Sequence, residues 1–388
     1  MTQSRLDSFG LAAAITLGTL GGLTIMALPG FVGLVGSLSR LDDQSLGYVA
    51  SWDINAMAGT IGLGAFLVPR YNWKHLALLS LALMAAGNAW TANCQDYLPI
   101  VLSRLCAGGG EGLAIAVSFA ALGSAPNPDR AFGIYLVVGQ TVSAGILVLL
   151  PLLESGVGPS VIFVGYALLF AAASVLARWL PARSPAMSSG IASAAPVDKR
   201  LAVAGLLGAF IYFIAQGAMW GYFDRIGAAN GIDPAIVGQA MGISSFSGTG
   251  GALLAVILCS RVSRSWLLIL SGVLSLASFW LLAGDVTVAA LFAAGILFNF
   301  GWNAAMPLLS GLCSEADCRG RVVVAMGSIQ TVGFGLGPAL TAMLLTGRNY
   351  VPAAWMSTAM LVIGLAIVLA GLKTRSPPAP LGQEGCSA

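Results

Sequence analysis

The chain has 388 residues, of which 57% are hydrophobic and only 9% are charged, and its formal net charge is +3. Its mean hydropathy is +0.88. Because soluble domains carry about 25% charged residues, this composition excludes a water-soluble fold of this size. It indicates a protein whose surroundings are the hydrocarbon of a lipid bilayer.

Twelve apolar runs of bilayer length follow one another along the chain. Six of them lie in the first half, at residues 11–35, 46–69, 76–93, 98–122, 131–153 and 159–180. The other six lie at residues 201–223, 234–258, 266–283, 286–312, 322–346 and 351–372. The first run is too long for the core of a signal peptide, so we expect it to span the membrane as well. The sequence therefore predicts an all-α membrane protein with twelve transmembrane helices.

Two six-helix halves are separated by a segment rich in Ser, Ala and Pro. We predict an N-terminal bundle over residues 1–180, a linker over 181–200, a C-terminal bundle over 201–376 and a tail over 377–388. With the N-terminus in the cytoplasm, fourteen basic residues fall on the inside, whereas the outside loops hold three, Arg40, Arg225 and Arg348. This bias predicts a multi-pass protein of the plasma membrane, the inner membrane in a bacterium, with both termini, the linker and the tail in the cytoplasm.

The two halves are related by an internal repeat. Gln140-Thr141-Val142 in the fifth run returns as Gln330-Thr331-Val332 in the eleventh, and Asp53 corresponds to Ser244. The offsets are close to 190 residues, about half of the chain. A six-helix unit has therefore been duplicated.

The layout and several short motifs resemble the major facilitator superfamily. The pattern Arg104-x-x-x-Gly108 is similar to the family's helix-4 motif, whose Arg has been linked to proton transfer in family members. The family's loop between helices 2 and 3 falls on Gly64 to His75, although Val68 and Pro69 stand where an Asp-Arg pair is usual. The resemblance covers essentially the whole chain. It implies two pseudo-symmetric six-helix bundles around one central site, and transport by alternating access.

By the same resemblance, charged loop residues are expected to act in conformational switching. These residues are Arg70, Lys74, Asp129, Arg130, Arg319 and Arg321. The Gly-Pro pair that marks helix 5 of many drug/proton antiporters is absent between Gly139 and Pro151, which counts against that group.

Three charged residues fall inside predicted membrane helices. Charge at mid-bilayer costs roughly 2.5–3.5 kcal/mol on insertion scales, so Asp53, Arg104 and Glu111 need a partner or a cavity. Asp53 and Arg104 lie at similar depth, which predicts an ion pair, and Glu111 lies two helical turns deeper on the face of Arg104. We expect these three residues to couple transport to protons. The structural alternative is a fixed salt bridge that only holds the N-terminal half together.

Polar and aromatic residues on other helices are candidates for substrate binding. Tyr212, Gln216 and Trp220 form a stripe along the seventh run, and Asn299 and Asn303 lie one turn apart in the tenth, with Trp302 beside them. Gln140 and Gln330 are related by the repeat. Amides in hydrocarbon need hydrogen-bond partners from another helix or from a ligand. For the aromatic residues, the alternatives are helix packing and a position at the membrane–water interface. Aromatic faces and amides suit a small organic molecule, and Arg104 adds suitability for a carboxylate.

Other chemistries find no support in the sequence. There is no phosphate-binding GxxxxGK[ST] loop, and the single histidine, His75, allows neither a catalytic triad nor a metal site. The six cysteines show no CxxC pair and are expected to be reduced packing residues. We expect no enzyme activity, no cofactor, no metal and no nucleic-acid partner.

The sequence therefore predicts a monomeric secondary transporter of a small organic solute, with an organic acid or an aromatic metabolite favoured and protons as the coupling ion. A drug or metabolite efflux antiporter is the alternative. A membrane sensor that kept the fold without transporting is a remote one, since the predicted tail is too short for a signalling domain.

Overall fold

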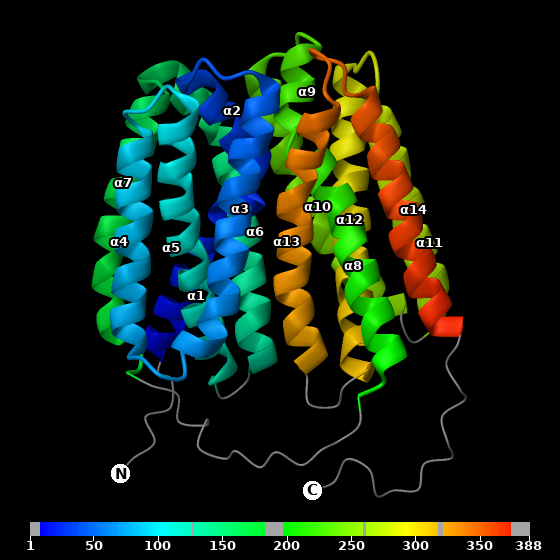
Figure 1. The fold of residues 1–388 in the computed structure, drawn as a ribbon, viewed down its shortest axis with the longest axis horizontal. Coiled ribbons are helices and arrows are strands. Elements are labelled where there is room, and N and C mark those ends of the chain that lie inside the picture. Colours follow the sequence, from blue (N-terminus) through cyan, green and yellow to red (C-terminus); the bar gives the residue numbers. More distant parts are fainter. Residues whose placement is uncertain (1–7, 126–127, 183–196, 259–260, 317–320, 374–388) are drawn as a thin grey trace, which may run out of the picture.

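The computed structural model describes residues 8–125, 128–182, 197–258, 261–316 and 321–373. In these residues the fold is helical throughout, with one isolated bridge between Thr346 and Asn349. Figure 1 shows two helical bundles standing side by side, one from each half of the chain. The first residues of α1 and the last residues of α14 lie at the same end, which we call the linker end because α8, the helix that follows the linker, also begins there.

The N-terminal bundle contains α1 (Ser8–Met26), α2 (Leu28–Leu38), α3 (Asp43–Leu67), α4 (Trp73–Thr91), α5 (Tyr97–Gly123), α6 (Pro128–Val157), α7 (Pro159–Ala173) and the 3-10 helix η1 (Ser174–Trp179). The C-terminal bundle contains α8 (Lys199–Trp220), α9 (Phe223–Ala229), α10 (Pro234–Leu258), α11 (Arg264–Leu281), α12 (Val288–Ala316), α13 (Arg321–Leu344) and α14 (Val351–Lys373).

All twelve predicted runs are helical, which confirms the fold class. The first run is divided at Ala27 into α1 and α2, where Pro29 occupies the first turn of α2 and needs no hydrogen-bond acceptor there. Several helices begin at a side-chain cap, among them Asp42 on the backbone N–H of Ser45 and Ser263 on that of Trp266. The sequence did not predict α9, a short helix at the end of the seventh run.

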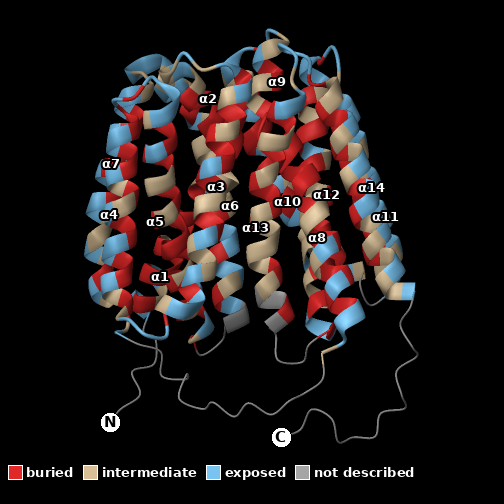
Figure 2. Ribbon diagram, in the orientation of Figure 1, coloured by how far each residue is buried: buried red, intermediate tan, exposed pale blue. Residues whose placement is uncertain are grey.

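The outward faces of the bundles are apolar. Figure 2 shows exposed residues along the flanks of α4, α7, α11 and α14, with buried residues between the helices. Leu168 on α7 and Trp266 on α11 are among the most exposed apolar side chains. Within the described ranges, eight helical spans are long and apolar enough to cross a membrane. These faces are suited to lipid contact.

The two bundles touch each other at the end opposite the linker. Gly47 of α3 lies against Tyr222 and the backbone of Pro338, and Gly238 of α10 lies against Leu147 and Pro151 of α6, so a Cβ at either glycine would collide. Such close approach of helix backbones depends on glycine.

Toward the linker end the same helix faces separate. Gly335 of α13 lies against Asn55 of α3, but Gly62, two turns further along the same face of α3, meets no atom within contact distance. Gly133 of α6 and Gly327 of α13 also face open space. The described residues are therefore closed at the end opposite the linker and open toward the linker end.

Candidate functional site

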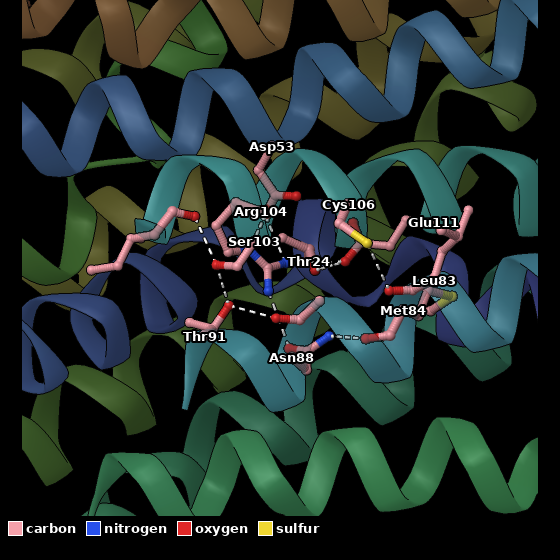
Figure 3. A network of polar contacts seen from close by, with 12 residues as sticks. Thr24, Asp53, Leu83, Met84, Asn88, Thr91, Ser103, Arg104, Cys106 and Glu111 are labelled. Atoms are coloured by element: carbon pink, nitrogen blue, oxygen red, sulfur yellow. Dashed lines mark hydrogen bonds and ion pairs between the residues drawn. The ribbon is translucent and has the colours of Figure 1, made fainter. Parts of the chain in front are cut away.

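Asp53, Arg104 and Glu111 form one cluster, which we call the ion cluster. Arg104 donates to Oδ2 of Asp53 through Nε at 3.0 Å and through Nη2 at 2.9 Å, and Nη2 also reaches Oε1 of Glu111 at 3.3 Å. Figure 3 shows the guanidinium of Arg104 between the two carboxylates. The expected Asp53–Arg104 contact is therefore present, and Glu111 joins it.

Glycines on α5 bring the ion cluster together. A Cβ on Gly108 would collide with the backbone oxygen of Asp53, and one on Gly112 would collide with the backbone of Met57. Because α3 and α5 approach this closely, the side chains of Asp53 and Arg104 can meet although they lie 51 residues apart in the chain.

The remaining partners of the ion cluster come from other helices of the N-terminal bundle. Thr24 of α1 donates its hydroxyl to Oε1 of Glu111 at 2.7 Å, and Nη1 of Arg104 donates to Oδ1 of Asn88 on α4 at 3.1 Å. The ring of Phe31 on α2 covers the guanidinium at 4.4 Å. The cluster thus contacts five helices of a single bundle.

The ion cluster is sealed inside that bundle in this conformation. The side chains of Asp53 and Arg104 are fully buried and that of Glu111 is 2% exposed, so none of them lines the space between the bundles. A cavity of about 20 Å³ lies next to the cluster and is lined by Thr24, Phe31 and Asn88 among others. This volume is enough for a single water molecule.

The C-terminal bundle has an uncharged counterpart of the ion cluster. Ser244 of α10 corresponds to Asp53 in the repeat, and its hydroxyl accepts a hydrogen bond from Nδ2 of Asn299 on α12 at 3.2 Å. Gly295 packs against Ser244 much as Gly108 packs against Asp53. At the offset that relates Asp53 to Ser244, Gly295 stands in the place of Arg104, so the second half has a neutral contact one helical turn further along α12 in place of the ion pair.

The predicted stripe on α8 points into the C-terminal bundle. Nε2 of Gln216 donates to the hydroxyl of Ser275 on α11 at 3.1 Å, and the ring of Trp220 stacks on Phe298 of α12 at 5.1 Å. Tyr212 is fully buried. Among the described residues, Oε1 of Gln216 and Nε1 of Trp220 are buried atoms with no hydrogen-bond partner, whereas the Tyr212 hydroxyl lies beside Ser271, Ser275 and Gln216. Their part in substrate binding stays a prediction.

The other predicted binding residues are half-buried in the middle of their helices. Trp302 projects from α12 toward α8 and α13. Its ring stacks on that of Phe334 of α13, with 5.2 Å between the ring centroids, and meets Phe213 of α8 edge-on. Asn303 donates to the backbone of Asn299 at 2.9 Å. Gln330 lies one turn before Phe334 on α13. Gln140 shares the face of α6 that contacts α10 further along the helix.

The predicted switch residues lie at the linker end where the structure describes them. Arg70 and Arg130 are exposed, and Nζ of Lys74 donates to the backbone oxygen of Arg178 at 2.9 Å. Asp129 and Arg321 lie in the first turns of α6 and α13, with their side chains outside the described residues. Arg319 lies outside the described residues altogether.

A second polar cluster joins the two bundles at the end opposite the linker. This Asp43 cluster consists of Asp43 at the start of α3 and three residues of the C-terminal half, Tyr222, Arg225 and Tyr350. Arg225 contacts Oδ1 of Asp43 at 2.7 Å through Nε and at 2.6 Å through Nη2. The Tyr350 hydroxyl donates to Oδ2 at 2.5 Å, and that of Tyr222 donates to the backbone oxygen of Asp43 at 2.8 Å.

The Asp43 cluster was not predicted from the sequence. In the sequence, Arg225 is one of three basic residues in the outside loops, and no local motif links it to a carboxylate 182 residues away. Burial and the hydrogen bond to Asp43 raise the pKa of Tyr350, so its hydroxyl keeps its proton and remains a donor.

A cavity of about 670 Å³ also lies at this end of the molecule. It is bounded by α2, α6, α9 and α10, and Glu154, Asp224 and Asp233 contribute to its wall. None of the predicted substrate-binding residues lines it. It is therefore separate from those candidates, but it adjoins the Asp43 cluster, because Arg225 also lines it.

Two pseudo-symmetric bundles that touch at one end, with charge buried inside one of them, form the arrangement that is typical of alternating-access transporters. The family model of the Major Facilitator Superfamily matches residues 205–385. The match lies in the C-terminal half, where the chain resembles this superfamily in sequence, and the fold of the described residues is the one found in the superfamily.

Solved structures support the same fold over nearly the whole chain. A point mutant of the nucleoside transporter NupG superposes with a TM-score of 0.76 at 15% identity, covering 93% of this chain and 99% of that one. A D-xylose-proton symporter gives 0.70 at 15% identity, with 93% and 95% covered. A bacterial homologue of the human lysosomal transporter Spinster, in an inward-facing conformation, gives 0.66 at 14% identity, with 97% and 100% covered. No curated protein matches the chain in sequence.

Proposed function

We propose that this protein is a proton-coupled secondary transporter of a small organic solute in the plasma membrane. The observation that carries this proposal is the charge balance of the ion cluster. Two carboxylates and one guanidinium lie together in a site that is 0–2% exposed, so the cluster holds one negative charge in excess when all three groups are ionised. A net charge away from water is costly, and binding one proton removes it.

Glu111 is the group that takes up and releases the proton. It shares Arg104 with Asp53 but makes one contact to the guanidinium, at 3.3 Å, where Asp53 makes two at 2.9–3.0 Å. Arg104 therefore stabilises the charge of Asp53 more strongly. Thr24, which donates to Glu111, also lines the adjoining cavity of about 20 Å³, which has room for one water molecule two hydrogen bonds from the carboxylate.

The conformation supports alternating access. With the linker in the cytoplasm, as the basic residues indicate, the structure is closed toward the outside by the Asp43 cluster and open toward the cytoplasm. Conversion to the opposite state requires the bundles to separate at the Asp43 cluster and meet at the linker end. The half-buried Gln140, Trp302, Asn303 and Gln330 are our candidates for contact with the solute.

The comparisons support the substrate class and the coupling only in general terms. NupG carries nucleosides, and the xylose carrier is a proton symporter. Both cargoes are small organic solutes, in keeping with the aromatic and amide residues of this chain.

The test is uptake into proteoliposomes with and without an inward proton gradient, using a panel of organic acids, aromatic compounds, nucleosides and sugars. We expect a gradient to drive accumulation of at least one of them. Glu111→Gln should abolish accumulation while solute exchange continues, because a neutral amide cannot release a proton. Glu315→Gln is the matched control, since Glu315 pairs with Arg264 at the linker end at 2.8 Å. Uphill transport that is unchanged in Glu111→Gln would contradict the coupling role.

A further inference from the structure

The hydrogen-bonding capacity of Arg104 is nearly used up inside the protein. Four of its five N–H groups have acceptors, on Asp53, Glu111 and Asn88. Its side chain is fully buried and the ring of Phe31 covers it. A substrate carboxylate would have to displace both Asp53 and Glu111 to form the two-pronged contact that guanidinium groups make with carboxylates.

No other described basic side chain is placed to receive an anion at mid-membrane. The rest lie in loops, in short helices or in the first or last turns of long helices: Arg40, Arg70, Lys74, Arg130, Arg178, Lys199, Arg200, Arg225, Arg261, Arg264, Arg348 and Lys373. An anion halfway across would therefore be desolvated without a partner, and it would meet an ion cluster that is itself neutral or negative.

The middle of the C-terminal bundle offers neutral hydrogen-bonding groups where its described residues offer no cation. Nε1 of Trp302 and Oε1 of Gln330 are buried atoms that have no hydrogen-bond partner within the part of the chain that the structure describes, although both side chains are half-buried overall. The ring of Trp302 stacks on Phe334, and Gln330 precedes Phe334 by one helical turn. An N–H donor, an amide acceptor and an aromatic surface thus lie close together between α12 and α13. Buried polar atoms without partners are rare and call for an explanation.

We infer that the transported solute is a neutral, ring-bearing molecule with its own hydrogen-bond donor and acceptor. Nε1 of Trp302 donates to the solute, Oε1 of Gln330 accepts from it, and its ring packs on the aromatic residues beside them. Carboxylates of the same shape are rejected because no cation is available to them. This inference deepens the proposed function, and it replaces the preference for an organic acid that Arg104 suggested in the sequence.

The experiment measures binding to the purified full-length chain in nanodiscs by thermal shift and isothermal titration. The probes are pairs matched in ring but not in charge: benzamide and benzoate, nicotinamide and nicotinate, uridine and uridine monophosphate. We expect at least one neutral member to bind and its anionic partner to bind about tenfold more weakly or not at all. Trp302→Phe keeps the ring and removes the N–H, so it should weaken binding about tenfold. Gln330→Leu should have a similar effect.

Trp355→Phe is the matched control, because Trp355 is 61% exposed on the outward face of α14 and should leave binding unchanged. Tighter binding of the anionic members, binding that is indifferent to Trp302→Phe, or no binding of any neutral member would overturn the inference. Binding is measured without a pH gradient. A failure of proton coupling in the uptake assay would therefore leave this result untouched, and the two proposals can fail separately.

Discussion

Replacing Asp43 with Asn should open the end of the molecule opposite the linker. The Asp43 side chain is 9% exposed and accepts hydrogen bonds from Arg225 and Tyr350 of the other bundle. Asn keeps the shape of Asp but loses the charge. One charge-assisted hydrogen bond contributes about 1.5–3 kcal/mol. Arg225 is 21% exposed and can be partly rehydrated, so we take a loss of about 2 kcal/mol in the closed state.

That loss shifts the equilibrium between closed and open forms by roughly thirtyfold, since about 1.4 kcal/mol corresponds to a factor of ten. The shift can be measured as a distance between spin labels at Asn93→Cys and Asp285→Cys, in a background without the native cysteines. These exposed positions lie in loops of different bundles at this end. The longer distance should gain population in Asp43→Asn.

Asp42 is the matched control for this measurement. It is the neighbouring carboxylate, and it caps α3 through the backbone N–H of Ser45 at 2.9 Å without a hydrogen bond to the C-terminal bundle. That bond lowers the pKa of Asp42. Asn still offers a side-chain oxygen to the N–H of Ser45, so Asp42→Asn should change α3 stability little and leave the label distance as it is. An unchanged distance in Asp43→Asn, or an equal change in Asp42→Asn, would refute the reasoning.

Three further predictions concern the N-terminal bundle. Thr24→Val removes the hydroxyl that donates to Glu111 at 2.7 Å, so the pH profile of gradient-driven uptake should move, and Thr24→Ser should restore it. Gly108→Ala forces a Cβ against the backbone of α3 and should lower stability by about 1–3 kcal/mol in thermal unfolding, whereas Gly62→Ala, which faces open space, should not. Arg104→Leu leaves two buried carboxylates without a cation, which should lower the free energy of unfolding by about 3–5 kcal/mol. The yield of folded protein in size-exclusion chromatography should fall sharply, and a normal yield would contradict this prediction.

The fold was predictable because hydrocarbon imposes a simple rule on sequence. Each span needs about twenty apolar residues, so the twelve runs were visible without any tertiary information. The break at Ala27 was missed because it lies inside a continuous apolar run, and α9 was missed because its seven residues follow the seventh run and include Asp224 and Arg225, as a loop would. A helix bend or a short terminal helix changes backbone geometry while leaving hydropathy as it was.

The ion cluster was predictable in part. The depth of Asp53 and Arg104 in their helices indicated that they pair, and burial in lipid required it. The direction in which the cluster points was not readable, because helix rotation within the bundle depends on packing such as that of Gly108 on α3. The Asp43 cluster could not be predicted either, because it too depends on how the helices pack. Its members sit at ends of helices, where charge is ordinary, and only the folded chain places Arg225 beside Asp43.

The contrast between Asp53–Arg104 and Ser244–Asn299 has a consequence for how such a carrier could change its cargo. The residues proposed to couple transport to protons all lie in the first half, whereas the unpartnered neutral groups beside Trp302 lie in the second. On this proposal, substitutions in the second half change the preferred solute while the residues that bind the proton stay as they are. A duplicated chain can thus keep its ion chemistry in one copy while the other copy diverges in specificity.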